Sequence, residues 1–233
     1  MLIHTHETVR PSLAWGVHLF TASGVLLGFL GLWSALEGDF ATAFLWLLGA
    51  TVVDAVDGFL ARAVRVEEVL PQIDGRRLDD LVDFVTYVVV PAFIMVKAGL
   101  LSWPELAGFP LMASALGFSN QAAKTQDHYF LGFPSYWNIV ALYLWSYQAP
   151  PWLAGLVVII LSALVLVPIR YIYPTRTAWG KPLTLILSAL WTLQLLWLLL
   201  HPGQGGWLLH LSLVYPLYYL LASLYLHFRK EPQ

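Results

Sequence analysis

The chain has 233 residues, of which 59% are hydrophobic and only 11% are charged. A water-soluble domain carries about 25% charged residues, so this composition excludes one and predicts an integral membrane protein. The net charge of −2 says little about partners, but no basic face is available for a nucleic-acid partner. The absence of cysteine excludes disulfides and thiol chemistry.

Long apolar runs follow one another along the chain, and about 20 apolar residues let a helix cross the hydrocarbon layer. The first run is too long for the apolar part of a signal peptide, so we expect it to be retained. The expected fold is all-α: a polytopic membrane helix bundle with about eight transmembrane helices, forming one domain over 1–233. The predicted helices are 13–36, 39–62, 79–97, 104–122, 134–148, 151–169, 182–200 and 206–227.

The positive charges support this count and predict an orientation. Lys and Arg in short loops concentrate on the cytoplasmic side of a membrane. With eight helices and a cytoplasmic N-terminus, eleven of the twelve Lys and Arg residues lie on that side, and only Lys97 lies outside. We therefore expect both termini in the cytoplasm.

One stretch, 53–84, holds eight of the fourteen carboxylates although apolar segments flank it. Asp54 and Asp57 are three residues apart near the end of the second predicted helix, and Asp79 and Asp83 are four apart at the start of the third. Each pair shares one face of its helix. Because a short turn joins the two helices, we expect the four carboxylates to converge at the cytoplasmic boundary.

Carboxylates at these positions need a compensating cation. A carboxylate within a membrane helix costs roughly 2.5–3.5 kcal/mol, and Asp54 and Asp57 directly follow the apolar run FLWLLGATVV. Glu67, Glu68 and Asp74 suit a solvated loop instead. Hard divalent cations bind carboxylate oxygens, and two such ions about 3.5–4 Å apart would also clamp a phosphate. The pattern therefore predicts a metal site for phosphate chemistry.

This stretch resembles the signature of the CDP-alcohol phosphotransferase family, which reads D-G-x2-A-R, a spacer, and G-x3-D-x3-D. It stands here as Asp57-Gly58-x2-Ala61-Arg62, twelve residues, and Gly75-x3-Asp79-x3-Asp83, with Asp54 three residues before it. The long spacer is similar to that of the branch whose acceptor alcohol is choline. VHLFTASG (17–24), KTQDHYFLGFPSYWNIVALYL (124–144) and PIRYIYPTRT (168–177) resemble that branch too, so the resemblance covers nearly the whole chain.

The resemblance implies transfer of the phosphatidyl group from CDP-diacylglycerol to choline, which gives phosphatidylcholine and CMP. It implies two divalent metal ions, Mn²⁺ or Mg²⁺, held by Asp54, Asp57 and Asp79, with Asp83 completing the set and acting as the base. A base is needed because the choline hydroxyl is a poor nucleophile until its proton is removed.

The resemblance also implies an enzyme of the bacterial inner membrane and a homodimer. It divides the chain into a six-helix core at about 13–169 and two additional C-terminal helices at about 182–227.

Further residues on the expected cytoplasmic side are candidates for contacts with the substrates. Those for CDP-diacylglycerol are Gly58, Ala61, Arg62, Gly75, Thr21, Lys124, Arg170 and Arg176. Choline is a quaternary ammonium ion, which aromatic faces attract, and its candidates are Tyr136, Trp137, Asn138, Tyr171 and Tyr173. Tyr and Trp also form interfacial belts in membrane proteins, and basic residues anchor loops, so structural roles stay open.

Two alternatives stay open as well. One is the same phosphotransfer to another alcohol, such as serine, inositol or a glycerol phosphate. The other is a transporter that binds a cation through buried aspartates. Transporters usually have inverted repeats and helices broken at the middle of the membrane, whereas the charge in this chain lies at one boundary.

Overall fold

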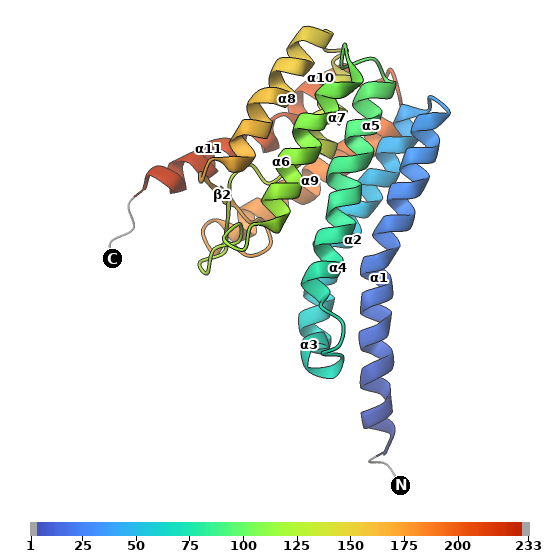
Figure 1. Ribbon diagram of the computed structural model, residues 1–233, viewed down its shortest axis with the longest axis vertical. Coiled ribbons are helices and arrows are strands. Elements are labelled where there is room, and N and C mark those ends of the chain that lie inside the picture. Colours follow the sequence, from blue (N-terminus) through green and yellow to red (C-terminus); the bar gives the residue numbers. More distant parts are fainter. Residues whose placement is uncertain (1–3, 230–233) are drawn as a thin grey trace.

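The computed structural model describes residues 4–229, and most of them are helical. Figure 1 shows the helices packed side by side, with α1 and α2 adjacent along most of their length. The helices are α1 (His4–Leu36), α2 (Phe40–Val64), α3 (Val66–Val69), α4 (Gly75–Asp83), η1 (Phe84–Val89), α5 (Val90–Lys97), η2 (Pro104–Ala107), α6 (Gly108–Ser119), α7 (Trp137–Ser146), α8 (Pro151–Leu166), α9 (Lys181–Leu200), α10 (Gly206–Ser212) and α11 (Val214–Phe228).

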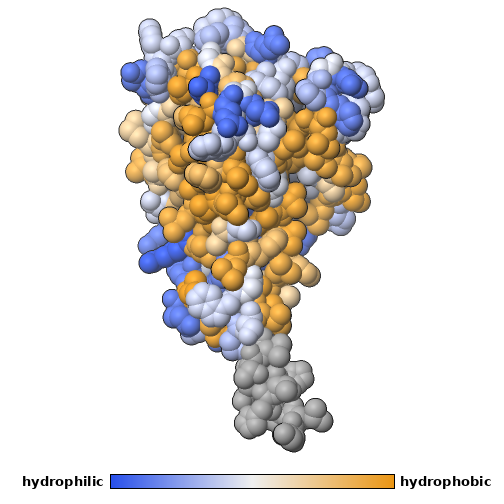
Figure 2. All heavy atoms as spheres, turned by 90° about the vertical axis from the view of Figure 1, so that its right-hand side faces the viewer, coloured by the Kyte–Doolittle hydropathy of each residue, from blue (hydrophilic) through white to orange (hydrophobic). Residues whose placement is uncertain are grey.

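The helical membrane fold is confirmed. Within residues 4–229, four segments are long and apolar enough to cross a membrane: Arg10–Leu36, Phe40–Val64, Lys181–Leu200 and Gly206–Phe228. On the face drawn in Figure 2, hydrophobic residues form a broad band between more polar ends. A band of this kind matches the hydrocarbon layer of a bilayer.

The other four predicted spans coincide with shorter or interrupted helices. The third runs through α4, η1 and α5 without a break in the chain direction, and the fifth is the ten-residue α7. These four segments fall short of the length and composition that mark the long ones, so their crossing of the membrane stays a prediction.

Local capping sets where the helices of the charged stretch begin and end. Asp39 accepts a hydrogen bond from the Thr42 N–H at the start of α2, and Arg65 ends that helix in a left-handed conformation with φ 58°. The Asp74 side chain accepts from the N–H groups of Arg76 and Arg77 and so caps α4. Such caps stabilise a helix by about 0.5–2 kcal/mol. They fix the registers in which α2 and α4 present their carboxylates.

The π-helical segment η1 follows directly after Asp83. Pro91 lies just beyond it, at the start of α5. Proline has no N–H, and its ring clashes with the carbonyl of the residue four positions earlier in a regular α-helix, which here is Tyr87. The wider π turn relieves this clash. We attribute the interruption of the third predicted helix to Pro91.

Two short strands were not predicted. β1 (Tyr129–Leu131) pairs antiparallel with β2 (Arg170–Ile172). The pairing joins the loop after α6 to the loop after α8, and α11 packs against β2. The strand pair therefore brings two loops and the C-terminal helix together at the end of the bundle that carries the aspartates (Figure 1).

Candidate active site

The structure brings together three carboxylates from two helices. One side-chain oxygen each from Asp54 and Asp57 on α2 and Asp79 on α4 lie within 4.8 Å of one another. Asp57 is buried, and the other two are half-buried. The spacing of three places the α2 pair on one face, as expected for a helix.

Asp83 lies one turn beyond Asp79. Within residues 4–229 its Oδ1 atom is buried and has no hydrogen-bond partner. It is close enough to Asp54 and Asp79 for their charges to act on it. Buried polar atoms are nearly always paired, so this oxygen is left available to accept a hydrogen bond or to bind a cation.

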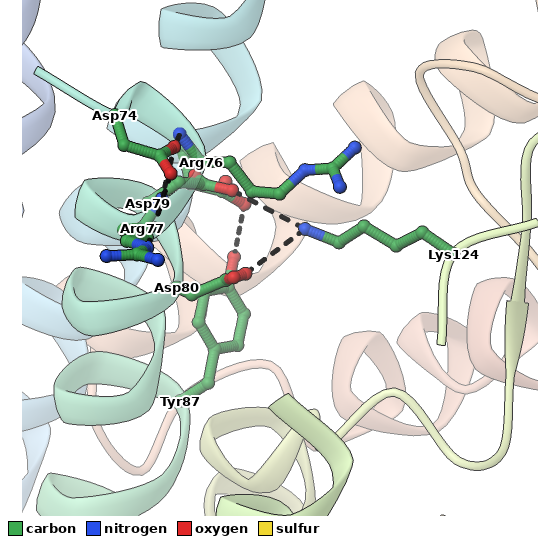
Figure 3. Close-up of polar contacts among 8 residues, drawn as sticks. Asp74, Arg76, Arg77, Asp79, Asp80, Tyr87 and Lys124 are labelled. Atoms are coloured by element: carbon green, nitrogen blue, oxygen red, sulfur yellow. Dashed lines mark hydrogen bonds and ion pairs between the residues drawn. The ribbon is translucent and has the colours of Figure 1, made fainter. Parts of the chain in front are cut away.

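Lys124 reaches across to α4 from the loop after α6 (Figure 3). Its Nζ lies 3.3 Å from the carboxylate of Asp80 and 3.7 Å from that of Asp79, and the side chain is 30% exposed. Burial works to lower the pKa of Lys124, but its acidic neighbours, Asp80 and Asp79 foremost, together outweigh burial, so the pKa is raised above its ordinary value. Lys124 therefore carries a positive charge beside the cluster.

The donor set fits a divalent metal. Carboxylate oxygens are preferred ligands of Mg²⁺ and Mn²⁺, and three are already within 4.8 Å of one another. The unpaired Asp83 oxygen adds a fourth acceptor. A single lysine does not balance this negative charge, so a bound cation is the natural complement.

The signature glycines face other residues of the site: Gly58 approaches the end of the Arg62 side chain, and Gly75 lies at an ordinary contact distance from His18. A Cβ on Gly58 would come within 3.1 Å of Arg62 Nη1, and one on Gly75 within 3.6 Å of His18 Cε1. Thr21 is close enough for its side chain to interact with Asp57. Ala61 packs beside a small apolar cluster of α1 and α3. These residues border the carboxylates on the α1 side.

The basic candidates separate into two groups. Arg62 and Arg176 are close enough for their charges to interact, and Tyr173 lies beside them. Arg170 instead pairs with Asp127 at 3.3 Å and lies over the Tyr129 ring. The structure therefore puts Arg176, but not Arg170, with the signature arginine.

The choline candidates also separate. Trp137 is fully buried, and its indole N–H donates to Ser114. Asn138 donates to the Thr51 hydroxyl at 3.0 Å. Tyr173 stacks on Phe130 with ring centroids 4.4 Å apart. Trp137 and Asn138 are thus engaged with the protein interior.

Tyr136 and Tyr171 belong to a chain of aromatic rings. Tyr136 contacts Tyr87 on one side and Tyr219 on the other, with centroids 5.9 and 6.0 Å apart. Tyr171 stacks against Tyr219 at 6.3 Å. Tyr87 in turn donates a hydrogen bond to Asp54. The rings therefore extend from the carboxylates to α11.

Sequence reasoning missed Tyr87, Tyr219 and the partner of Asp80. Asp80 lies outside the three-carboxylate group and forms a hydrogen bond and ion pair with Lys124. None of the candidate residues lay in the two predicted C-terminal helices, yet α11 contributes Tyr219. The one available signal was the position of Tyr87, four residues after Asp83 on the helix side that carries the aspartates.

Comparisons with known proteins agree with this geometry. A family model described as CDP-alcohol phosphatidyltransferase matches residues 18–125, which include all four aspartates. The chain is 38% identical to a phosphatidylcholine synthase of Rhizobium johnstonii, over 92% of this chain and 90% of that protein. It is 38% identical to one of Legionella pneumophila, over 91% and 88%. The chain therefore belongs to the CDP-alcohol phosphatidyltransferase family.

Proposed function

We propose that the protein transfers the phosphatidyl group of CDP-diacylglycerol to choline, which gives phosphatidylcholine and CMP. The observation that carries the proposal is the convergence of Asp54, Asp57 and Asp79, with the free Asp83 oxygen one turn away. Relatives named phosphatidylcholine synthase match most of the chain at 36–41% identity, and they support choline as the acceptor.

The carboxylates of Asp54, Asp57 and Asp79, with Asp83, would hold two divalent ions, Mn²⁺ or Mg²⁺. When bound, the ions offset the negative charge of the diphosphate and of the departing CMP. Lys124 and Arg62 add positive charge for the substrate phosphates, with Arg176 beside Arg62. The charges gather where a lipid head group meets the aqueous phase.

Asp83 acts as the general base. Its free Oδ1 accepts the hydroxyl proton of choline, and the choline oxygen forms a bond to the phosphorus that carries diacylglycerol. The bond from that phosphorus to the CMP oxygen breaks, and CMP leaves with the electron pair. Burial of Asp83 Oδ1 excludes water that would otherwise compete for the proton.

The aromatic candidates supply the choline site. The side chains proposed to contact choline are those of Tyr136, Tyr171 and Tyr173. The interior wall of the choline site is formed by Trp137 and Asn138. A cation–π contact contributes about 0.5–2 kcal/mol. Loss of a contacting ring should therefore raise the KM for choline several-fold to tens-fold and leave the KM for CDP-diacylglycerol unchanged. If the alanine variants of Tyr136, Trp137, Tyr171 and Tyr173 all keep the wild-type KM for choline, the choline site lies elsewhere.

The decisive assay offers purified protein CDP-diacylglycerol, Mn²⁺ and a panel of labelled alcohols, and measures CMP release and the labelled lipid. Choline as the preferred acceptor supports the proposal. Preference for serine, inositol or glycerol phosphate would move the enzyme to another branch of its family. A transporter would release no CMP with any alcohol.

The remaining expectations from the sequence belong to the same proposal. The enzyme lies in the bacterial inner membrane with both termini and the site in the cytoplasm. The core at about 13–169 carries the chemistry, and the helices at about 182–227 are an addition to it. A homodimer, which the resemblance implies, stays a prediction that size-exclusion chromatography with light scattering tests.

A further inference from the structure

Tyr87 occupies a buried position directly beside the carboxylate cluster. Its side chain is 5% exposed, and its hydroxyl donates a hydrogen bond of 2.9 Å to Oδ2 of Asp54 on the neighbouring helix. Figure 3 shows it below Asp79 and Asp80, on the helical stretch that continues from them. The contact joins residues 33 positions apart in the sequence.

Helical spacing accounts for this placement. Tyr87 lies within η1, which follows α4 without a break and separates it from α5. A residue four positions after Asp83 lies on the helix side that carries Asp83. Tyr87 and Asp83 thus both face Asp54, whose charge acts on each of them.

A second hydrogen bond supports α2 about one turn before Asp54. Thr51 lies three residues before Asp54, beside the Tyr87 hydroxyl. It accepts a 3.0 Å hydrogen bond from the Asn138 side chain on α7 and donates to the Leu47 carbonyl. Asn138, Thr51 and Tyr87 therefore hold this part of α2 against α7 and η1.

We propose that Tyr87 is a positioning residue for the metal site, which orients Asp54 as a ligand through its hydroxyl group, with Thr51 and Asn138 supporting it. An ionised carboxylate accepts hydrogen bonds and cannot donate, so the single Tyr87 proton fixes one of its two oxygens. The three-carboxylate cluster needs only one oxygen from each residue. Asp54 can thus accept the Tyr87 hydrogen bond and supply its oxygen to the cluster in a single orientation.

The size of the expected effect follows from metal sites in general. Groups that hydrogen-bond to a ligand orient it, and their removal typically costs 10–100-fold in metal affinity or activity. Tyr87→Phe keeps the ring and its packing and removes only the hydroxyl. We expect the dissociation constant for Mn²⁺ to rise about 10–100-fold, and kcat to recover at high Mn²⁺.

The experiment measures free Mn²⁺ by electron paramagnetic resonance during titration of the purified protein, alongside CMP release as a function of Mn²⁺ concentration. Tyr143→Phe is the matched control, because its half-buried hydroxyl also bonds two partners, Ser212 and Trp191, and neither partner is a carboxylate. It should keep the wild-type Mn²⁺ affinity. An equal loss of affinity in both variants would show a general packing effect and overturn the proposal.

The inference rests on the proposed metal role of Asp54, and the design separates the two. If Asp54→Asn keeps wild-type Mn²⁺ affinity, the proposed metal site is wrong. If Asp54→Asn loses affinity but Tyr87→Phe does not, only the role of Tyr87 is overturned. Should Tyr87→Phe fail to fold, Thr51→Val removes the neighbouring support at nearly constant shape, and wild-type Mn²⁺ affinity in that folded variant would likewise count against the proposal.

Discussion

Asp54, Asp57 and Asp79 place three carboxylates within a few ångströms, and Lys124 adds one positive charge beside them. Asparagine keeps the shape of aspartate but removes its charge. Asn at any one of the three positions should therefore abolish CMP release and weaken Mn²⁺ binding. Because the residues act as a unit, double variants should be little worse than single ones. CMP release and Mn²⁺ titration measure the two effects.

Glu105→Gln serves as the matched control for these variants, because it makes the same carboxylate-to-amide change at an exposed position outside the site. It should behave as the wild type. Near-normal turnover in any of the three aspartate variants would remove that residue from the metal set.

Asp83 differs from the other three in its free, buried oxygen. As the proposed base it would remove a proton, and the proposal does not require it to hold both ions. Asp83→Asn should cut kcat by roughly 10²–10⁴ and leave the affinities for Mn²⁺ and CDP-diacylglycerol largely intact. Turnover and titration of both ligands test this. If the variant loses Mn²⁺ affinity as badly as Asp79→Asn, Asp83 is a ligand and another group takes the proton.

At the residue scale, sequence predicted what helical periodicity determines. The spacings of three and four put each pair of aspartates on one face of its helix. The apolar flanking residues indicated that these carboxylates lie within membrane helices, where a charge is energetically unfavourable. It did not predict that Lys124 contacts Asp79 and Asp80, because that contact joins residues about 44 positions apart through an irregular loop. Nor did it predict the bond from Tyr87 to Asp54, which joins two helices across 33 positions of the sequence.

At the scale of elements, hydropathy located the helices but not their interruptions. The pattern of apolar residues through 79–97 is the same whether the turns are α or π, and only Pro91 indicated a departure. The strand pair β1–β2 has three residues on each side, which is too short for an alternating pattern to stand out. Both features nevertheless lie next to the candidate site.

The C-terminal helix α11 is attached to this end of the bundle by hydrogen bonds to Ile172 on β2. The Tyr219 hydroxyl donates to the Ile172 carbonyl at 2.9 Å, and the Ile172 N–H donates to Ser223 Oγ at 3.0 Å. Tyr219→Phe removes the first bond. It should lower the free energy of unfolding by about 0.5–1.5 kcal/mol, a shift of roughly 1–6 °C in Tm at this chain length.

Thermal unfolding in detergent measures that shift. Tyr225→Phe on the same helix is the control, because Tyr225 is 54% exposed and should lose little stability. Equal Tm values for the two variants would show that the Tyr219 hydroxyl does not attach α11. The Mn²⁺ affinity should be unchanged in both, since neither hydroxyl contacts a carboxylate ligand.

The two ends of the molecule differ. The carboxylate cluster, on α2 and α4, lies toward the end that carries α3, and the α9–α10 turn lies toward the other end (Figure 1). Eleven of the twelve positive charges fall on one side of the predicted topology, which the rule for short loops places in the cytoplasm. In that orientation, the proposed substrates would be exchanged on the cytoplasmic side. The orientation follows from charge distribution alone and is open to a direct test.

Single cysteines provide that test, because the chain has none of its own. Gln72→Cys lies in the exposed turn before α4, and Gln204→Cys lies in the exposed turn before α10. In intact spheroplasts, a membrane-impermeant maleimide should label Gln204→Cys and spare Gln72→Cys until the membrane is permeabilised. The cysteine-free parent controls for background labelling, and CMP release verifies that both variants are folded. Labelling of Gln72→Cys from outside would reverse the orientation and put the aspartates on the wrong side for a cytoplasmic nucleotide.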